Sequence, residues 1–190
     1  YEIGTAIRTR DGWLYAAAKL PKVGVLMRMQ PDGSGMNEVL DVAGGEITDL
    51  AFAPDGTLWM TTIEADGGKL CRVSNDQWGV TVEPVVTQID GKALSCPAAV
   101  AVGADGKVYF TNAADVSVKY GLESALRTEL LAHTATGWVY AYDPVTRAVE
   151  RVLGGVAGAA GLALSADGET LYVSDLGSRC IWAVPSGGSG

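Results

Sequence analysis

The chain has 190 residues, of which 48% are hydrophobic, and its 22 acidic and 14 basic side chains give a formal net charge of −8. This hydrophobic content is enough for a buried core and excludes a disordered chain. The acidic charge and the absence of a basic run argue against a nucleic-acid partner. No apolar stretch approaches the ~18–20 residues that a membrane helix needs.

Four copies of one pattern organise the chain: an apolar run, an Asp-Gly pair and a second run rich in β-forming residues. The Asp residues of these pairs are Asp11, Asp55, Asp105 and Asp167, which are 44, 50 and 62 residues apart. Repetition at this length, with strand signals in every unit, is typical of β-propeller blades, which are four-stranded antiparallel sheets. We therefore expect an all-β propeller.

The predicted blades cover residues 1–43, 44–95, 96–157 and 158–190, and the last blade is incomplete. The strands expected in the first two blades are 3–7, 13–18, 23–29, 37–42, 47–53, 57–63, 69–73 and 82–89. The strands expected in the last two are 97–102, 107–111, 138–142, 148–153, 161–164, 170–174 and 180–184. Each Asp-Gly pair is read as the tight turn between the first two strands of its blade, because Gly adopts a positive φ without a steric clash.

A short amphipathic helix is predicted inside the third blade, over residues 121–131. Leu122, Ala125, Leu126 and Leu130 recur on one face at helical spacing. We expect this helix to lie over one mouth of the central channel.

The fourth blade offers three strands and lacks a fourth. An unclosed sheet exposes unpaired backbone groups that invite association. We therefore expect further propeller blades or a protein partner to complete the ring. A closed ring of four blades is the alternative.

Several segments of the chain resemble the strictosidine synthase-like propellers, which belong with the gluconolactonase and senescence-marker-protein group. Examples are DGKVYFTN at 105–112, GWVYAYDPVT at 137–146 and GLALSADG at 161–168. The likeness is strongest over residues 90–182, and it extends to the inserted helix. It implies a six-bladed family type, of which about four blades are present here.

This resemblance implies two chemistries. Gluconolactonase-like members hold one divalent cation on the channel axis and use it to polarise a lactone or ester carbonyl for attack by water. Strictosidine synthase-like members condense an amine with an aldehyde and use a Glu as the proton carrier. If this chain is an enzyme, we expect a lactonase or esterase with calcium or zinc, or a condensing enzyme.

The residues of this chain depart from the family at the positions that matter for a metal. Ala98 and Ala99 stand where the family usually has Asn-Asp, and Ala160 stands where it usually has Asn. A methyl group cannot ligate a hard cation, which requires oxygen ligands. No cofactor is therefore predicted, and the leading hypothesis is a binding or scaffolding module that has lost metal-dependent catalysis.

Counting back from the Asp-Gly pairs places Glu2, Glu46 and Cys96 at equivalent positions that open inner strands, with Thr48 and Asp49 beside Glu46. Carboxylates brought together at such a mouth form an acid/base pair or a weak cation site, whereas separate carboxylates are solvated rim residues. Glu2, Glu46 and Asp49 are the catalytic candidates. Thr48 and Cys96 are candidates for contact with a small-molecule ligand.

His133 is the only histidine in the chain and follows the predicted helix. It is a candidate general base over the channel. The alternative is that it caps the helix C-terminus, where a positive side chain is favoured.

Overall fold

The computed structural model describes residues 2–8, 12–20, 23–76, 79–116 and 121–187. The first antiparallel sheet contains, in spatial order, β1 (Glu2–Arg8), β2 (Leu14–Leu20), β3 (Val23–Met29) and β4 (Asn37–Ala43). The second contains β5 (Glu46–Phe52), β6 (Leu58–Glu64), β7 (Gly67–Asp76) and β8 (Gly79–Val86).

The third sheet contains β11 (Pro97–Val102), β12 (Val108–Asn112), β13 (Gly137–Tyr142) and β14 (Val149–Val156). The fourth contains three strands, β15 (Ala159–Leu164), β16 (Thr170–Asp175) and β17 (Cys180–Pro185). A small hairpin of β9 (Gln88–Ile89) and β10 (Lys92–Ala93) connects the second and third sheets. The predicted all-β architecture of propeller blades is confirmed.

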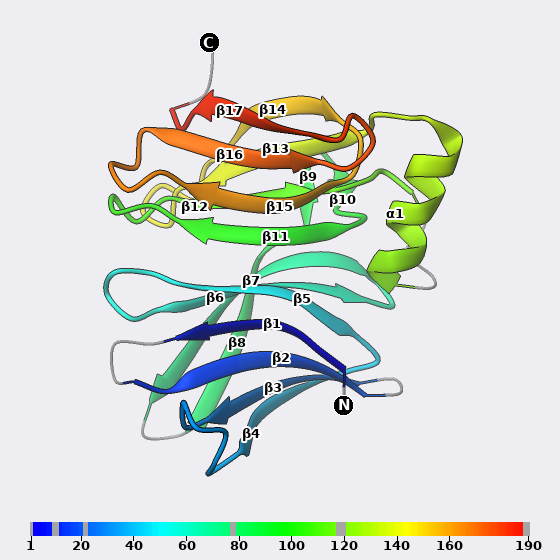
Figure 1. Cartoon of the computed structure of the whole chain (residues 1–190). Coiled ribbons are helices and arrows are strands. Elements are labelled where there is room, and N and C mark those ends of the chain that lie inside the picture. The colour runs from blue at the N-terminus through cyan, green and yellow to red at the C-terminus, as the bar shows by residue number, and fades with distance from the viewer. Residues whose placement is uncertain (1, 9–11, 21–22, 77–78, 117–120, 188–190) are drawn as a thin grey trace.

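The first strands of the four sheets lie next to one another. β1 neighbours β5, β5 neighbours β11, and β11 neighbours β15. Figure 1 shows this succession, with the four sheets stacked through the molecule. The first strand of each sheet is therefore the inner strand, as expected for propeller blades.

Hydrophobic side chains fill the spaces between neighbouring sheets. Leu26 of the first sheet packs with Leu50 and Met60 of the second. Phe110 of the third sheet packs with Trp59 of the second, and Val139 packs with Leu171 of the fourth. Each of these clusters is shared by two sheets, so burial of apolar area holds the sheets to one another.

All four inner strands change register near their first residues. Each has one more residue than the partner strand at this place, which is a β-bulge. The residues inside the bulges are Gly4, Thr5, Thr48, Ala98, Ala99 and Ala160. The equivalent positions that were counted back from the Asp-Gly pairs therefore share one local backbone geometry.

The predicted insertion in the third sheet is the helix α1 (Gly121–Ala132), between β12 and β13. None of the described helices has the length and apolar character of a membrane span.

Candidate functional site

The helix α1 lies at the end of the sheets where the inner strands begin (Figure 1). Its buried residue Ala125 packs in a cluster with Ile63 of the second sheet and with small side chains in and beside the third sheet. The members of this cluster are Ile63, Cys96, Ala98, Ala113, Ala114, Ala125 and the half-buried Val116, Leu122 and Leu126. The helix therefore covers the strand ends at which the candidate residues stand.

Glu46, the first residue of β5, holds the start of this helix. Its Oε2 accepts a hydrogen bond from the backbone N–H of Leu122 at 3.3 Å and lies 3.2 Å from Nζ of Lys19. A carboxylate is favoured at a helix N-terminus because the free N–H groups there carry partial positive charge. Gly121 has a φ of 84°, and a Cβ at that residue would lie 2.7 Å from Oε2, so glycine permits this approach.

Glu2 opens β1, the strand next to β5, and its backbone pairs with Lys19. The side chain of Glu2 lies outside the described residues. The two candidate acids thus begin neighbouring inner strands, and Lys19 links the two strands through its backbone pairing and its ion pair.

Thr48 and Asp49 connect the second sheet to the third. The hydroxyl of Thr48 lies 2.9 Å from the carbonyl oxygen of Pro97 and 2.8 Å from the hydroxyl of Thr61. Oδ2 of Asp49 accepts the backbone N–H of Val100 at 2.9 Å. Both polar side chains are engaged in bonds between blades, which gives each of them a structural role.

The three alanines at the family's ligand positions lie inside bulges. Ala98 and Ala99 are buried, and Ala160 is half-buried. The backbone N–H of Ala99 donates to Oγ1 of Thr111 at 3.1 Å. Within the described ranges, no group of three or more His, Cys, Asp or Glu side chains is placed to hold a metal ion. The methyl groups of these alanines offer no oxygen ligand to a hard divalent cation.

Cys96 is fully buried, and its backbone N–H donates to Oδ1 of Asn112 at 2.7 Å. Burial raises the pKa of its thiol to about 12, and the negative charges of Glu46 and Glu129 act in the same direction. A thiol with this pKa is a poor nucleophile at neutral pH, because the thiolate is the reactive form.

His133 directly follows α1 and has a φ of 51°. Its backbone N–H donates to the carbonyl of Leu130, and the N–H of Thr134 donates to the carbonyl of Glu129. These two bonds form a Schellman motif, in which a left-handed residue ends the helix. His133 is exposed, and its observed role is to end the helix through its backbone.

Sequence reasoning missed Glu129, a charged residue of α1 that is fully buried. Its carboxylate accepts hydrogen bonds from the hydroxyl of Thr134 and from the backbone N–H and hydroxyl of Thr136. One feature of the sequence could have indicated its burial: Glu129 stands four residues after Ala125 and therefore on the same face of the helix. These three bonds satisfy the carboxylate locally, so it fixes the segment that leads from α1 to β13.

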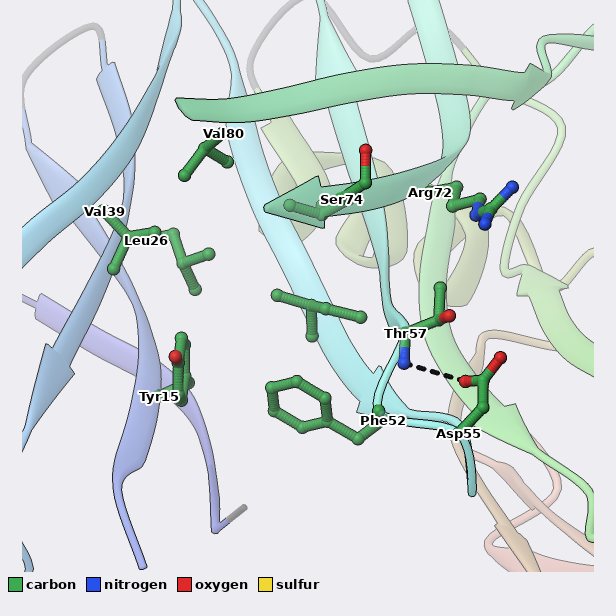
Figure 2. A pocket seen from close by; sticks show the side chains of 12 residues that line it. Tyr15, Leu26, Val39, Phe52, Asp55, Thr57, Arg72, Ser74 and Val80 are labelled. Carbon is green, nitrogen blue, oxygen red and sulfur yellow. Dashed lines mark hydrogen bonds between the residues drawn. The ribbon is translucent and has the colours of Figure 1, made fainter. Parts of the chain in front are cut away.

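Three cavities are lined by residues that the structure describes. One, of about 320 Å³, lies between the first and second sheets (Figure 2), and another, of about 350 Å³, lies between the second and third. A third, of about 280 Å³, lies beside the β9–β10 hairpin. None of these three is lined by Glu46, Thr48, Asp49 or Cys96.

Comparison with known proteins supports the expected resemblance. A family model described as strictosidine synthase matches residues 98–182. No curated protein matches the chain.

Solved structures share the fold at low sequence identity. A gluconolactonase from Xanthomonas campestris is 15% identical, with a TM-score of 0.65 over 96% of this chain and 56% of that one. A virginiamycin B lyase from Staphylococcus aureus is 13% identical, with a TM-score of 0.63 over 99% of this chain and 54% of that one. A chain of a nidogen/laminin complex is 14% identical, with a TM-score of 0.68 over 98% of this chain and 61% of that one.

This chain therefore spans a little over half the length of those structures. The match over residues 98–182 confirms the resemblance to strictosidine synthase-like and gluconolactonase-like propellers. The solved structures include two kinds of enzyme and a member of a protein complex. The fold alone therefore does not select an activity.

Proposed function

We propose that this strictosidine synthase-like propeller is a binding or scaffolding module that has lost the metal-dependent catalysis of its family. The observation that carries the proposal is the presence of Ala98, Ala99 and Ala160 inside the bulges of their inner strands. These are the positions at which the resemblance expects oxygen ligands. Methyl groups there leave a cation without its ligands.

The oxygen-bearing side chains that remain nearby support the same proposal. Glu46 binds the N-terminus of α1 and Lys19, and the side chains of Thr48 and Asp49 bind the third sheet. A cation or substrate would have to displace these bonds before it gained a contact. Their arrangement is that of a polar network that stabilises the fold.

Exposed apolar side chains on the fourth sheet support a partner. Tyr172 and Ile181 are 43% and 71% exposed. Ile181 pairs with Ser174, two residues after Tyr172, so both side chains lie on one face of the sheet. Apolar groups gathered on a surface mark sites of association. Further propeller blades or a protein partner would bury this face, and a related fold in a nidogen/laminin complex is in keeping with a protein partner.

The alternative is a lactone or ester hydrolase, or an amine–aldehyde condensing enzyme, with Glu2, Glu46, Asp49 or His133 as catalytic groups. The strictosidine synthase match over residues 98–182 favours this alternative. If the chain is a hydrolase, its cofactor would be calcium or zinc. Glu2 is the first of the catalytic candidates to test.

Metal analysis combined with an activity assay separates the two proposals. The purified chain is incubated with calcium or zinc, dialysed and analysed for metal, and then assayed with glucono-1,5-lactone with and without EDTA. The module proposal expects no stoichiometric metal and no turnover above the rate of the buffer. One bound ion per chain, together with hydrolysis that EDTA abolishes, would establish the enzyme and end the module proposal.

A further inference from the structure

Two pockets lie side by side at the second sheet and share Asp55, Thr57 and Arg72. The first, between the first and second sheets, is called the apolar pocket, and the second, between the second and third sheets, is called the acidic pocket. Their volumes, about 320 and 350 Å³, lie at the small end of the range of ligand sites. Each has room for one side chain of a bound molecule, and the shared residues form the ridge between them.

The apolar pocket takes its name from its walls. Tyr15 of β2 and Phe52 of β5 meet edge to face, with ring centroids 5.3 Å apart. Val39 and Val80 are half-buried and complete the wall. Figure 2 shows Tyr15, Val39 and Val80 on the side of the pocket away from Arg72 and Asp55, with the ring of Phe52 extending toward Tyr15. This pocket suits an aliphatic or aromatic side chain.

The acidic pocket has carboxylates on its rim and apolar groups on its walls. Asp105 and Asp143 join Asp55 around it. Hydrogen bonds from backbone N–H groups of their own turns lower the pKa of Asp55 and of Asp143, so both are anions at neutral pH. The buried Trp59 and the exposed Val145 supply apolar surface beside them. A lysine or arginine suits this pocket, because its stem covers apolar surface while its head meets carboxylates.

Arg72 stands on the ridge between the two pockets. In the part of the chain that the structure describes, no carboxylate oxygen lies within 4.0 Å of its guanidinium, although its charge contributes to the lowered pKa of Asp55. Arg72 is exposed and pairs with Trp59 and Glu83 on the neighbouring strands. A guanidinium offers five N–H donors, which peptide carbonyl groups can accept.

We propose that these two pockets bind an extended peptide segment that places an apolar side chain in the apolar pocket and a basic side chain in the acidic pocket. The guanidinium of Arg72 holds the carbonyl groups between the two side chains. The chain's net charge of −8 favours the approach of such a basic segment. The inference rests on the proposed function as a binding module and names the partner that this module takes.

A peptide panel tests the proposal. The probes are fluorescein-labelled Gly/Ser nonapeptides that carry one Leu and one Lys, separated by zero, one, two or three residues. Matched peptides carry Glu in place of Lys, or Ser in place of Leu. We expect at least one Leu/Lys spacing to raise the fluorescence anisotropy on addition of the chain, and both matched peptides of that spacing to bind about fivefold or more weakly.

Single substitutions in the chain test whether the selected peptide binds in the apolar and acidic pockets. Val80 is half-buried, lines the apolar pocket and packs against the cluster between the first two sheets, so Val80→Trp fills that pocket from its wall. Asp143→Asn removes a charge from the acidic pocket and keeps an oxygen that can accept the N–H groups of Val145 and Thr146. Arg72→Gln removes the ridge charge. Each variant is expected to weaken the selected peptide about fivefold or more.

Asp167 provides the matched control. It accepts the N–H of Glu169 in the Asp-Gly turn of the fourth sheet, which corresponds to the turn of Asp55, and it lines neither pocket. Asp167→Asn is expected to bind the peptide as the parent chain does, and circular dichroism checks that every variant is folded. Absence of binding by every Leu/Lys peptide at millimolar concentration, or binding that Val80→Trp and Asp143→Asn leave unchanged, would overturn the proposal. Neither result bears on the metal analysis, so the module proposal can stand if the peptide site fails.

Discussion

The carboxylate of Asp49 accepts the backbone N–H of Val100 at 2.9 Å, across the boundary between the second and third sheets. Val100 is buried, so this N–H group has no water to replace a lost partner. One side chain of an inner strand thereby completes the hydrogen bonding of the next inner strand.

Replacement of Asp49 by Ala is expected to lower the free energy of unfolding by about 1–3 kcal/mol, the cost of leaving a buried donor unsatisfied. Asp49→Asn keeps an acceptor oxygen and is expected to lose less. Urea unfolding monitored by tryptophan fluorescence measures both. Equal losses for the two variants would show that the charge of Asp49, and not its bond to Val100, supports the fold.

Replacement of Glu46 by Gln is expected to loosen α1, because the helix N-terminus loses its negative partner. Hydrogen exchange of α1 amides is expected to accelerate several-fold, while exchange in β6 and β12 stays at the parent rate. Glu123→Gln is the control, since Glu123 is exposed in the first turn of the same helix. If both variants accelerate exchange equally, the bond between Glu46 and Leu122 is not what anchors the helix.

Replacement of His133 by Gly is expected to raise the free energy of unfolding by about 0.5–1 kcal/mol. The left-handed backbone of this residue strains any side chain with a Cβ, and glycine removes that strain. His133→Ala is the control, because it deletes the imidazole and keeps the Cβ. Thermal unfolding distinguishes them: destabilisation by both substitutions would mean that the imidazole itself contributes to stability.

The three free cysteines are expected to differ in reactivity. Cys180 is exposed, whereas burial raises the pKa of Cys71 to about 11 and that of Cys96 to about 12. In the native chain at pH 7.5, one thiol is expected to react rapidly with DTNB. After unfolding, all three thiols are expected to react. A second fast thiol in the native state would show that a buried strand opens readily.

The raised pKa values of the two buried thiols also predict that the free energy of unfolding decreases at alkaline pH. The folded-state pKa values of Cys71 and Cys96 lie above the ordinary thiol value of 9.0, so the fold favours the protonated thiols. Their contribution is complete below about pH 9 and is lost as the pH rises through the folded-state values. Cys71→Ser and Cys96→Ser would each reduce this dependence.

The repeat pattern was sufficient to predict the fold, because each Asp-Gly turn acts locally. Gly56 and Gly106 have the positive φ values that such turns require. The helix was also predictable, because the leucines and Ala125 recur at helical spacing within one segment. The prediction over residues 121–131 and the observed Gly121–Ala132 agree closely.

The candidate site was predictable only in part. Counting back from the Asp-Gly pairs placed Glu46 correctly at the start of an inner strand, since the bulges preserve this count in every blade. Its partner Leu122 is 76 residues away in sequence, and no local pattern reveals that contact. Arg72 and Asp143 could not be identified from the sequence either, because the pocket that they line forms only where one sheet packs on the next.

The hydrophobic clusters between neighbouring sheets have a mechanical consequence. Because each cluster belongs to two sheets, detaching an outermost sheet sacrifices one cluster and leaves the remaining ones intact. A chain stretched from its two ends in an optical trap should therefore yield in successive rips, each about one blade in contour length, in place of a single collapse.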